Sequence, residues 1–225
     1  MYHGYSVSHE KFVWAARLEP GVLSAFSKIW SPDSNLLVSF DGINMTLPRP
    51  LSSSTSPRPP PPPTRWPHQD QNSLIRGFQC AQGIINLIDN GPRDGGLVVM
   101  RGSHLLNDAF FATHGGAGRK KAAWGAAVPD DWFGFDEGEV GWFEGRGCEV
   151  VKVCAGAGDL IVWDSRTVHW NVLPEVSLSL TFDFSRLIWE EGRVPYCALR
   201  ICIYTYICVC VYACVCILQG GWDMS

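Results

Sequence analysis

The sequence predicts a mainly β protein of the sandwich or jelly-roll type, and three observations support this fold class. From residue 66 onward, short apolar stretches alternate with turns rich in Gly, Pro and Asp, as expected of many short strands. These stretches are not separated by regular helical segments, which argues against a βαβ fold. The 225 residues show no internal repeat of 20–50 residues and are long enough for one domain with its own core.

The individual elements follow from local patterns. Residues 9–31 have apolar side chains at helical spacing, with Glu19-Pro20 suited to a first turn, and predict a helix. Residues 36–40 predict a short strand, residues 105–113 a helix, and residues 115–147 a loop with scattered aromatic side chains. The other expected strands are residues 78–88, 97–100, 149–153, 159–163, 167–171 and 177–185.

Charge and the N-terminus narrow the class of function and the compartment. The chain has 18 Lys and Arg against 22 Asp and Glu, a formal net charge of −4. Nucleic-acid binding needs a basic face, so we expect no nucleic-acid partner. The first twelve residues are polar and contain no apolar stretch of the secretory type, so we expect a cytoplasmic protein.

One segment, residues 66–71 (WPHQDQ), carries an imidazole and a carboxylate two positions apart. Side chains at i and i+2 of a strand project from the same face, so His68 and Asp70 can meet at one point. After 98 intervening residues, His169 follows the apolar stretch of residues 158–164 (GDLIVWD). Two histidines and one carboxylate on a β scaffold are the ligand set of non-haem Fe(II) oxygenases, which leave positions open for cosubstrate and O₂. The sequence therefore predicts an iron site formed by His68, Asp70 and His169.

Four segments also carry a family resemblance: residues 66–71, 83–90 (GIINLIDN), 94–104 (DGGLVVMRGSH) and 158–174 (GDLIVWDSRTVHWNVLP). Together they resemble the phytanoyl-CoA dioxygenase-like family of Fe(II)/2-oxoglutarate oxygenases over roughly residues 36–174. The resemblance implies a double-stranded β-helix, a cupin-like jelly roll, with a few flanking helices. It implies Fe(II), 2-oxoglutarate and O₂, with ascorbate as reductant, and hydroxylation of a small organic or acyl substrate.

The chain departs from this family where the cosubstrate should be held. The family places an arginine on the strand after the distal histidine, where it clamps a carboxylate of 2-oxoglutarate. Residues 177–185 (SLSLTFDFS) contain no base at all. Arg166 before the strand of His169 and Arg186 after residues 177–185 are the two substitutes. His104, which follows a Gly-Ser pair at a predicted helix start, is interpreted as structural.

Two windows of unusual composition set the domain boundaries. Nine of the 15 prolines lie between Pro48 and Pro67, and six of the nine cysteines between Cys197 and Cys216. We divide the chain into residues 1–47 (helix and first strand of the oxygenase domain), 48–65 (disordered Pro/Ser-rich insertion), 66–185 (jelly-roll metal-binding core) and 186–225 (aberrant hydrophobic tail).

The tail follows a rule of the genetic code. From Arg200 to Ile217, even positions are Arg, Cys or Tyr and odd positions are Ile, Thr, Val or Ala. DNA of strictly alternating purine and pyrimidine encodes this pattern, which indicates intron read-through or a mispredicted exon. The proline window has pyrimidine-rich codons and suggests a similar origin.

Several alternatives stay open. A non-catalytic remnant or mispredicted gene product with a jelly-roll fold would retain the metal face without the cosubstrate clamp. Residues 201–218 are apolar enough for a membrane anchor near the lower length limit, and residues 58–63 (RPPPPP) match a ligand of an SH3-type partner. For both segments, we favour an origin in translated non-coding DNA over these two roles.

Overall fold

The computed structural model describes residues 6–31, 36–40, 43–46, 65–115, 131–175, 179–182, 187–189 and 215–217. The helices are η1 (Val7–His9), α1 (Lys11–Arg17), α2 (Pro20–Trp30), α3 (Ser103–His114) and α5 (Glu137–Glu144). The strands are β1 (Ile43–Thr46), β2 (His68–Gln69), β3 (Cys80–Ile85), β4 (Gly96–Arg101), β5 (Phe133–Gly134), β6 (Glu149–Lys152), β7 (Leu160–Asp164), β8 (His169–Val172), β9 (Ser179–Phe182), β10 (Leu187–Trp189) and β11 (Val215–Ile217).

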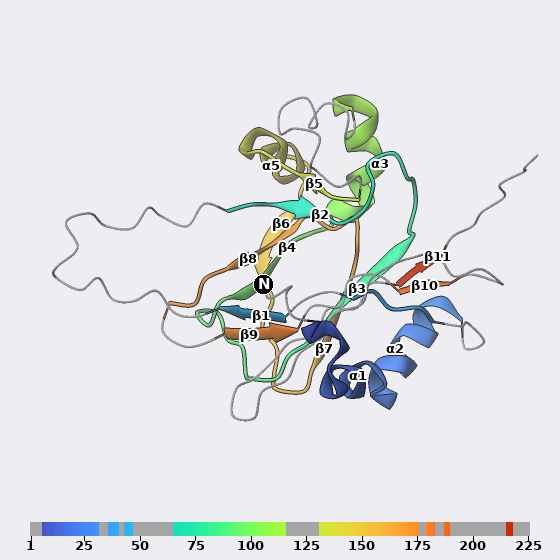
Figure 1. Ribbon diagram of the computed structural model, residues 1–225. Helices are drawn as coiled ribbons and strands as arrows, with labels where there is room; N and C mark the ends of the chain where they lie inside the picture. Colours follow the sequence, from blue (N-terminus) through green and yellow to red (C-terminus); the bar gives the residue numbers. More distant parts are fainter. Residues whose placement is uncertain are drawn as a thin grey trace, which may run out of the picture.

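Two sheets of mostly antiparallel strands carry the fold (Figure 1). One has five strands in the order β5-β2-β8-β4-β6, and the other has four in the order β10-β11-β3-β7. A separate antiparallel pair joins β1 to β9. Within the described residues, the parallel pairing is that of β10 with β11. The predicted mainly β class is therefore confirmed, and each of the six strands expected after residue 77 overlaps an observed strand.

The N-terminal helices cover the four-stranded sheet. Val13 of α1 and Phe26 of α2 are fully buried and belong to one cluster with Ile84 of β3, Leu97 of β4 and Trp163 of β7. Strand β3 is buried along its whole length, including the polar side chain of Gln82. Burial of this kind contributes about 25 cal/mol per Å² of apolar surface removed from water.

A second, aromatic cluster lies at the other end of the molecule, where α3 and α5 approach β5 in Figure 1. Phe110 of α3 lies 5.0 Å from Phe143 of α5 and 5.3 Å from Phe135, measured between ring centroids. Met100 and Val168, at the ends of the strands that lead to the site, belong to the same cluster and are fully buried. These contacts anchor the metal-side end of the five-stranded sheet.

Three expectations of local structure were wrong. The single helix over residues 9–31 is two helices, because the chain turns at residues 18–19 and Pro20 begins α2 at its first position. Residues 36–40 form no strand beyond one bridge at Phe40. Residues 115–147 are not all loop, since they include β5 and α5; the side chain of Asp136 caps α5 in a reciprocal capping box with Glu139.

Several sequence-based predictions fall outside the described residues. They include the insertion at residues 48–64, Arg186, the SH3-type ligand at residues 58–63 and most of the tail. Two parts of the tail are described, β10 and β11; they pair with each other, and β11 also pairs with β3 through Val215 and Cys216. No helix among the described residues combines the length and the apolar character needed to cross a membrane.

Candidate metal centre

The pairing of β2 with β8 brings together the two histidines that the sequence separates. His68 and His169 are direct antiparallel partners, and side chains of such a pair lie on the same face of the sheet. Asp70 follows His68 by two positions and its backbone N–H donates to the carbonyl of Ser165, 3.2 Å away. One ligand atom from each of His68, Asp70 and His169 lies within 4.8 Å of the others. Within the described residues, this is the one such cluster of three or more.

Backbone carbonyls select the tautomer of both imidazoles. Nδ1 of His68 lies 3.1 Å from the carbonyl oxygen of Trp66, and Nδ1 of His169 lies 2.9 Å from that of Thr167. A carbonyl oxygen only accepts hydrogen bonds, so each Nδ1 carries a proton, and in the neutral imidazole Nε2 then keeps its lone pair. This is the arrangement of a metal-ligating histidine, whose other nitrogen donates to a carbonyl or carboxylate.

The three lone-pair donors fit a divalent metal. Oδ2 of Asp70 lies 3.3 Å from Nε2 of His169 and 3.8 Å from Nε2 of His68. Two imidazole lone pairs and a carboxylate oxygen repel one another at these separations unless a cation lies among them. Imidazole and carboxylate ligands suit Fe(II), and three protein ligands leave open coordination positions.

Burial and charge set the protonation of the cluster. The side chains of His68 and His169 are 7% and 4% exposed, whereas that of Asp70 is 25% exposed. Burial, with a smaller contribution from His169, lowers the pKa of His68 to about 4 despite the opposing effect of Asp70. Burial raises the pKa of Asp70, but the two imidazoles and the Gln82 amide outweigh it and hold that pKa well below its usual range. At neutral pH, His68 is neutral and Asp70 is ionised, the protonation states that metal binding requires.

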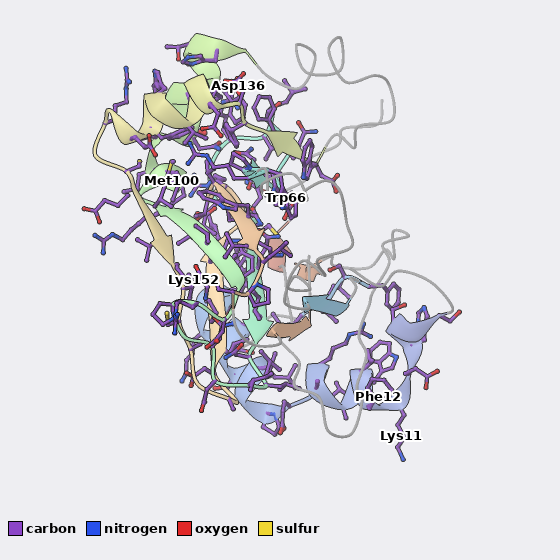
Figure 2. The ribbon with its side chains drawn as sticks, turned by 90° about the vertical axis from the view of Figure 1, so that its left-hand side faces the viewer. Lys11, Phe12, Trp66, Met100, Asp136 and Lys152 are labelled. Atoms are coloured by element: carbon purple, nitrogen blue, oxygen red, sulfur yellow. The ribbon has the colours of Figure 1, made fainter. Side chains whose placement is uncertain are left out.

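Indole rings pack around the two imidazoles. The Trp66 ring is stacked on that of His68 with centroids 4.4 Å apart and an interplanar angle of 6°, and Trp132 stacks on the same imidazole at 5.8 Å. Trp163 contacts His169 edge-on at 5.3 Å. Trp66, labelled in Figure 2, lies between the end of the molecule that carries Asp136 and the end that carries Phe12. These rings hold the imidazoles in place and limit access of water.

The residues that alternate with the ligands form a buried polar network. Gln69 donates to the carbonyl of Gln71 and accepts a hydrogen bond from Asn107 of α3. Gln71 accepts a 3.0 Å hydrogen bond from Ser165 and donates to the carbonyls of Ile75 and Gly77. The two glutamines are buried in the body of the protein, while His68 and Asp70 face the metal position. This network fixes the backbone that presents the ligands.

Ser103 supports the strand of the distal histidine. It is fully buried, its hydroxyl donates to the carbonyl of Met100, and it accepts a 2.9 Å hydrogen bond from the backbone N–H of Val168. Val168 directly precedes His169, so one hydroxyl joins the end of β4 to the start of β8. His104, interpreted from the sequence as structural, is the second residue of α3 and is not part of the triad.

Of the two arginines considered for 2-oxoglutarate, only Arg166 lies among the described residues. Arg166 lies in the turn between β7 and β8, and its guanidinium forms a two-pronged ion pair with Asp164, at 2.6 Å for Nη2 and 3.0 Å for Nε. Its hydrogen bond to Asp164 raises its pKa further. The fork that would grip a cosubstrate carboxylate is therefore already occupied. Arg186 lies outside the described residues.

Sequence reasoning missed two residues of this site. Gln82 of β3 donates a 2.6 Å hydrogen bond to Oδ2 of Asp70, and Ser103 joins the strands as described above. The Gly-Ser pair before His104 was a visible signal for Ser103. No local pattern marks Gln82, since it lies within an apolar strand and meets Asp70 only through the tertiary fold.

One curated relative shares much of this sequence. The "Ava biosynthesis cluster protein O" of Aspergillus versicolor is 44% identical to this chain over 165 residues, which cover 73% of this chain. The match spans half the length of that relative. No protein-family model matches the chain.

Among solved structures, EctD from S. alaskensis with bound Fe has a TM-score of 0.50 and 13% identity, covering 87% of this chain and 65% of that one. EctD crystallised with 2-oxoglutarate and 5-hydroxyectoine matches with a TM-score of 0.47 and 12% identity, covering 80% of this chain and 53% of that one. The first comparison confirms the predicted jelly-roll fold.

Proposed function

We propose that this chain is a non-haem Fe(II)- and 2-oxoglutarate-dependent oxygenase that hydroxylates a small organic or acyl substrate. The observation that carries the proposal is the convergence of Nε2 of His68, Nε2 of His169 and a carboxylate oxygen of Asp70, with both imidazoles held in the ligating tautomer. As a ligand set, this is the 2-His-1-carboxylate triad of such oxygenases.

In the proposed reaction the protein holds the metal and shields it, and the atoms balance as follows. His68, Asp70 and His169 would hold Fe(II), which when bound would supply the redox chemistry for O₂, with one oxygen atom ending in succinate and the other in the substrate. The products are succinate, CO₂ and the alcohol, from 2-oxoglutarate, O₂ and a C–H bond, and ascorbate keeps the iron reduced. His68, Asp70 and His169 hold the metal on one side, and the stacked indoles of Trp66 and Trp132 keep water from its histidine face.

The comparisons support this proposal at two levels. EctD, whose fold this chain shares, has been crystallised with Fe and with 2-oxoglutarate. The Aspergillus versicolor relative belongs to a biosynthesis cluster, which favours a small-molecule substrate. Because the chain spans half of that relative, the activity of the whole protein is part of the proposal as well.

The cosubstrate carboxylate has two candidate partners, Arg166 and Arg186. The Arg166 guanidinium is already paired with the Asp164 carboxylate, so this ion pair would have to break before Arg166 could bind a carboxylate of 2-oxoglutarate. Arg186, the other candidate, lies outside the described residues. An Arg166→Lys substitution, which loses the planar guanidinium, distinguishes the two candidates. If Arg166 holds the cosubstrate, 2-oxoglutarate binding should weaken; if Arg186 holds it, binding should be unchanged.

The proposal is tested on the purified full chain given Fe(II), ascorbate, O₂ and 2-oxoglutarate. We expect succinate to form even without a substrate, through uncoupled turnover, and His68→Ala to abolish it. His104→Ala is the matched control, since it removes a histidine of the same domain that is not part of the triad. One equivalent of bound iron without succinate would contradict the proposal and favour a non-catalytic jelly-roll protein.

A further inference from the structure

Gln82 connects the two sheets at the metal centre. It lies on β3 in the four-stranded sheet, whereas His68 and His169 lie on β2 and β8 of the five-stranded sheet. Its side-chain amide donates a 2.6 Å hydrogen bond to Oδ2 of Asp70, the oxygen that faces both imidazole Nε2 atoms. The residue is 1% exposed, so this hydrogen bond is formed out of water.

The carboxylate dictates which way the amide faces. An ionised carboxylate only accepts hydrogen bonds, so the NH₂ group of Gln82 must face Asp70 and Oε1 must face away. Oε1 is buried and has no hydrogen-bond partner in the part of the chain that the structure describes. An unsatisfied buried acceptor is costly, and such atoms are rare in folded proteins. The amide therefore donates to Asp70 although this orientation leaves its own Oε1 without a hydrogen bond among the described residues.

Asp70 needs such a partner to present one oxygen in a defined direction. The terminal torsion of an aspartate is broad, so its carboxylate rotates easily when nothing bonds to it. Among the described residues, the Gln82 amide is the side chain outside the triad that donates a hydrogen bond to this carboxylate. Partners of this kind orient metal ligands, and their loss typically weakens metal affinity about 10–100-fold.

We propose that Gln82 is a positioning residue that holds the Asp70 carboxylate toward the metal from the opposite sheet, an inference that rests on the proposed metal site.

The test substitutes Gln82→Met, which keeps the length of the side chain and removes the amide. Co(II) replaces Fe(II) as the probe, because it is stable in air and its d–d absorption reports the ligand geometry. Affinity is measured by calorimetric titration of the full chain, and stability by urea unfolding of the metal-free protein. The matched control is Gln79→Met, three residues earlier, where the side chain bonds only to the carbonyl of Arg76 at the surface.

We expect Gln82→Met to bind Co(II) at least about 10-fold more weakly, with an altered d–d spectrum and a urea midpoint close to that of the wild type. Gln79→Met should match the wild type in all three measurements. If Gln82→Met binds Co(II) with wild-type affinity and spectrum, the positioning role is wrong although the metal site stands. If the wild-type chain itself binds no Co(II), the metal site and the inference both fail.

A measurement on the wild-type protein covers the case in which Gln82→Met does not fold. Diamagnetic Zn(II) is added to ¹⁵N-labelled protein, and the side-chain NH₂ resonances of Gln82 and Gln79 are followed. We expect the Gln82 resonance to shift on saturation and the Gln79 resonance to stay in place. A Gln82 resonance unmoved by bound Zn(II) would overturn the inference.

Discussion

His68 is held in its neutral form by its surroundings. Burial, together with the neighbouring His169, lowers its pKa to about 4, and its Nδ1 proton is engaged by the Trp66 carbonyl. The imidazole is thus ready for a metal at neutral pH without first losing a proton. The same property makes the metal-free protein sensitive to acid, since unfolding exposes a histidine with an ordinary pKa near 6.5.

The stability of the metal-free protein should fall as the pH is lowered from about 7 to 4. In this range the unfolded chain binds a proton at His68 that the folded chain does not, so protonation favours unfolding. The loss of unfolding free energy should approach about 3 kcal/mol. Urea unfolding in the presence of a chelator, repeated along this pH range, measures it. A His68→Gln variant should lack this contribution, and equal pH slopes for the two proteins would refute the explanation.

The ligand residues were the part of the site most open to sequence reasoning. The His68-x-Asp70 pair is local, and the i, i+2 spacing of an expected strand predicted both side chains on one face. His169 was predicted by the apolar stretch before it and by the family resemblance. The contact of Gln82 with Asp70 was not predictable, because it depends on how two separate strands come together.

At the scale of elements, α3 and β8 are joined by a single hydroxyl. Ser103 begins α3, bonds the Met100 carbonyl at the end of β4 and accepts the N–H of Val168 just before β8. The strand that carries His169 therefore starts at a position defined by α3. Asn107, one turn further along the same helix, bonds Gln69 beside the other histidine.

Replacing Ser103 by alanine should destabilise the fold by about 2 kcal/mol, because it leaves the buried N–H of Val168 without an acceptor. The free energy of urea unfolding checks the size. Ser24→Ala, an exposed site on α2, is the matched control and should be neutral or slightly stabilising, given the helix propensity of alanine. A Ser103→Ala protein as stable as the control would show that the hydroxyl contributes nothing.

Element boundaries were predicted well where the pattern was strong. Strands β3, β4, β6, β7 and β8 follow apolar runs between turn residues, and α3 matches its predicted span closely. The sequence of α5 lies in the segment predicted to be loop, and its Gly138 and Gly141 disfavour helix. Its capping box and the burial of Val140 and Phe143 in the aromatic cluster compensate for the glycines.

At the scale of the whole molecule, the metal position ties the two sheets together. Its ligands come from β2, the residue just after β2, and β8, and Asp70 is bonded in turn to β3 of the other sheet. A bound cation would replace mutual repulsion among the ligand atoms by attraction. Metal binding should therefore stabilise the entire domain rather than one loop.

Co(II) at 100 times its dissociation constant should raise the free energy of unfolding by about 2.7 kcal/mol, because it binds the folded state only. Thermal unfolding with Co(II) and with excess chelator measures the difference. A His169→Ala variant should show little of this gain, while His104→Ala should show all of it. A stabilisation that persists in His169→Ala would place the metal elsewhere.

The sequence by itself determined the mainly β class, most of the strands and the identity of the three proposed ligands. These features depend on residue periodicity and short spacing, which are local properties of the chain. The tertiary structure alone decided that His169 lies directly opposite His68, although 98 residues separate it from Asp70, and that Gln82 reaches Asp70 from the other sheet. The physical reason is that these contacts arise from sheet register and packing between distant segments, which no local pattern encodes.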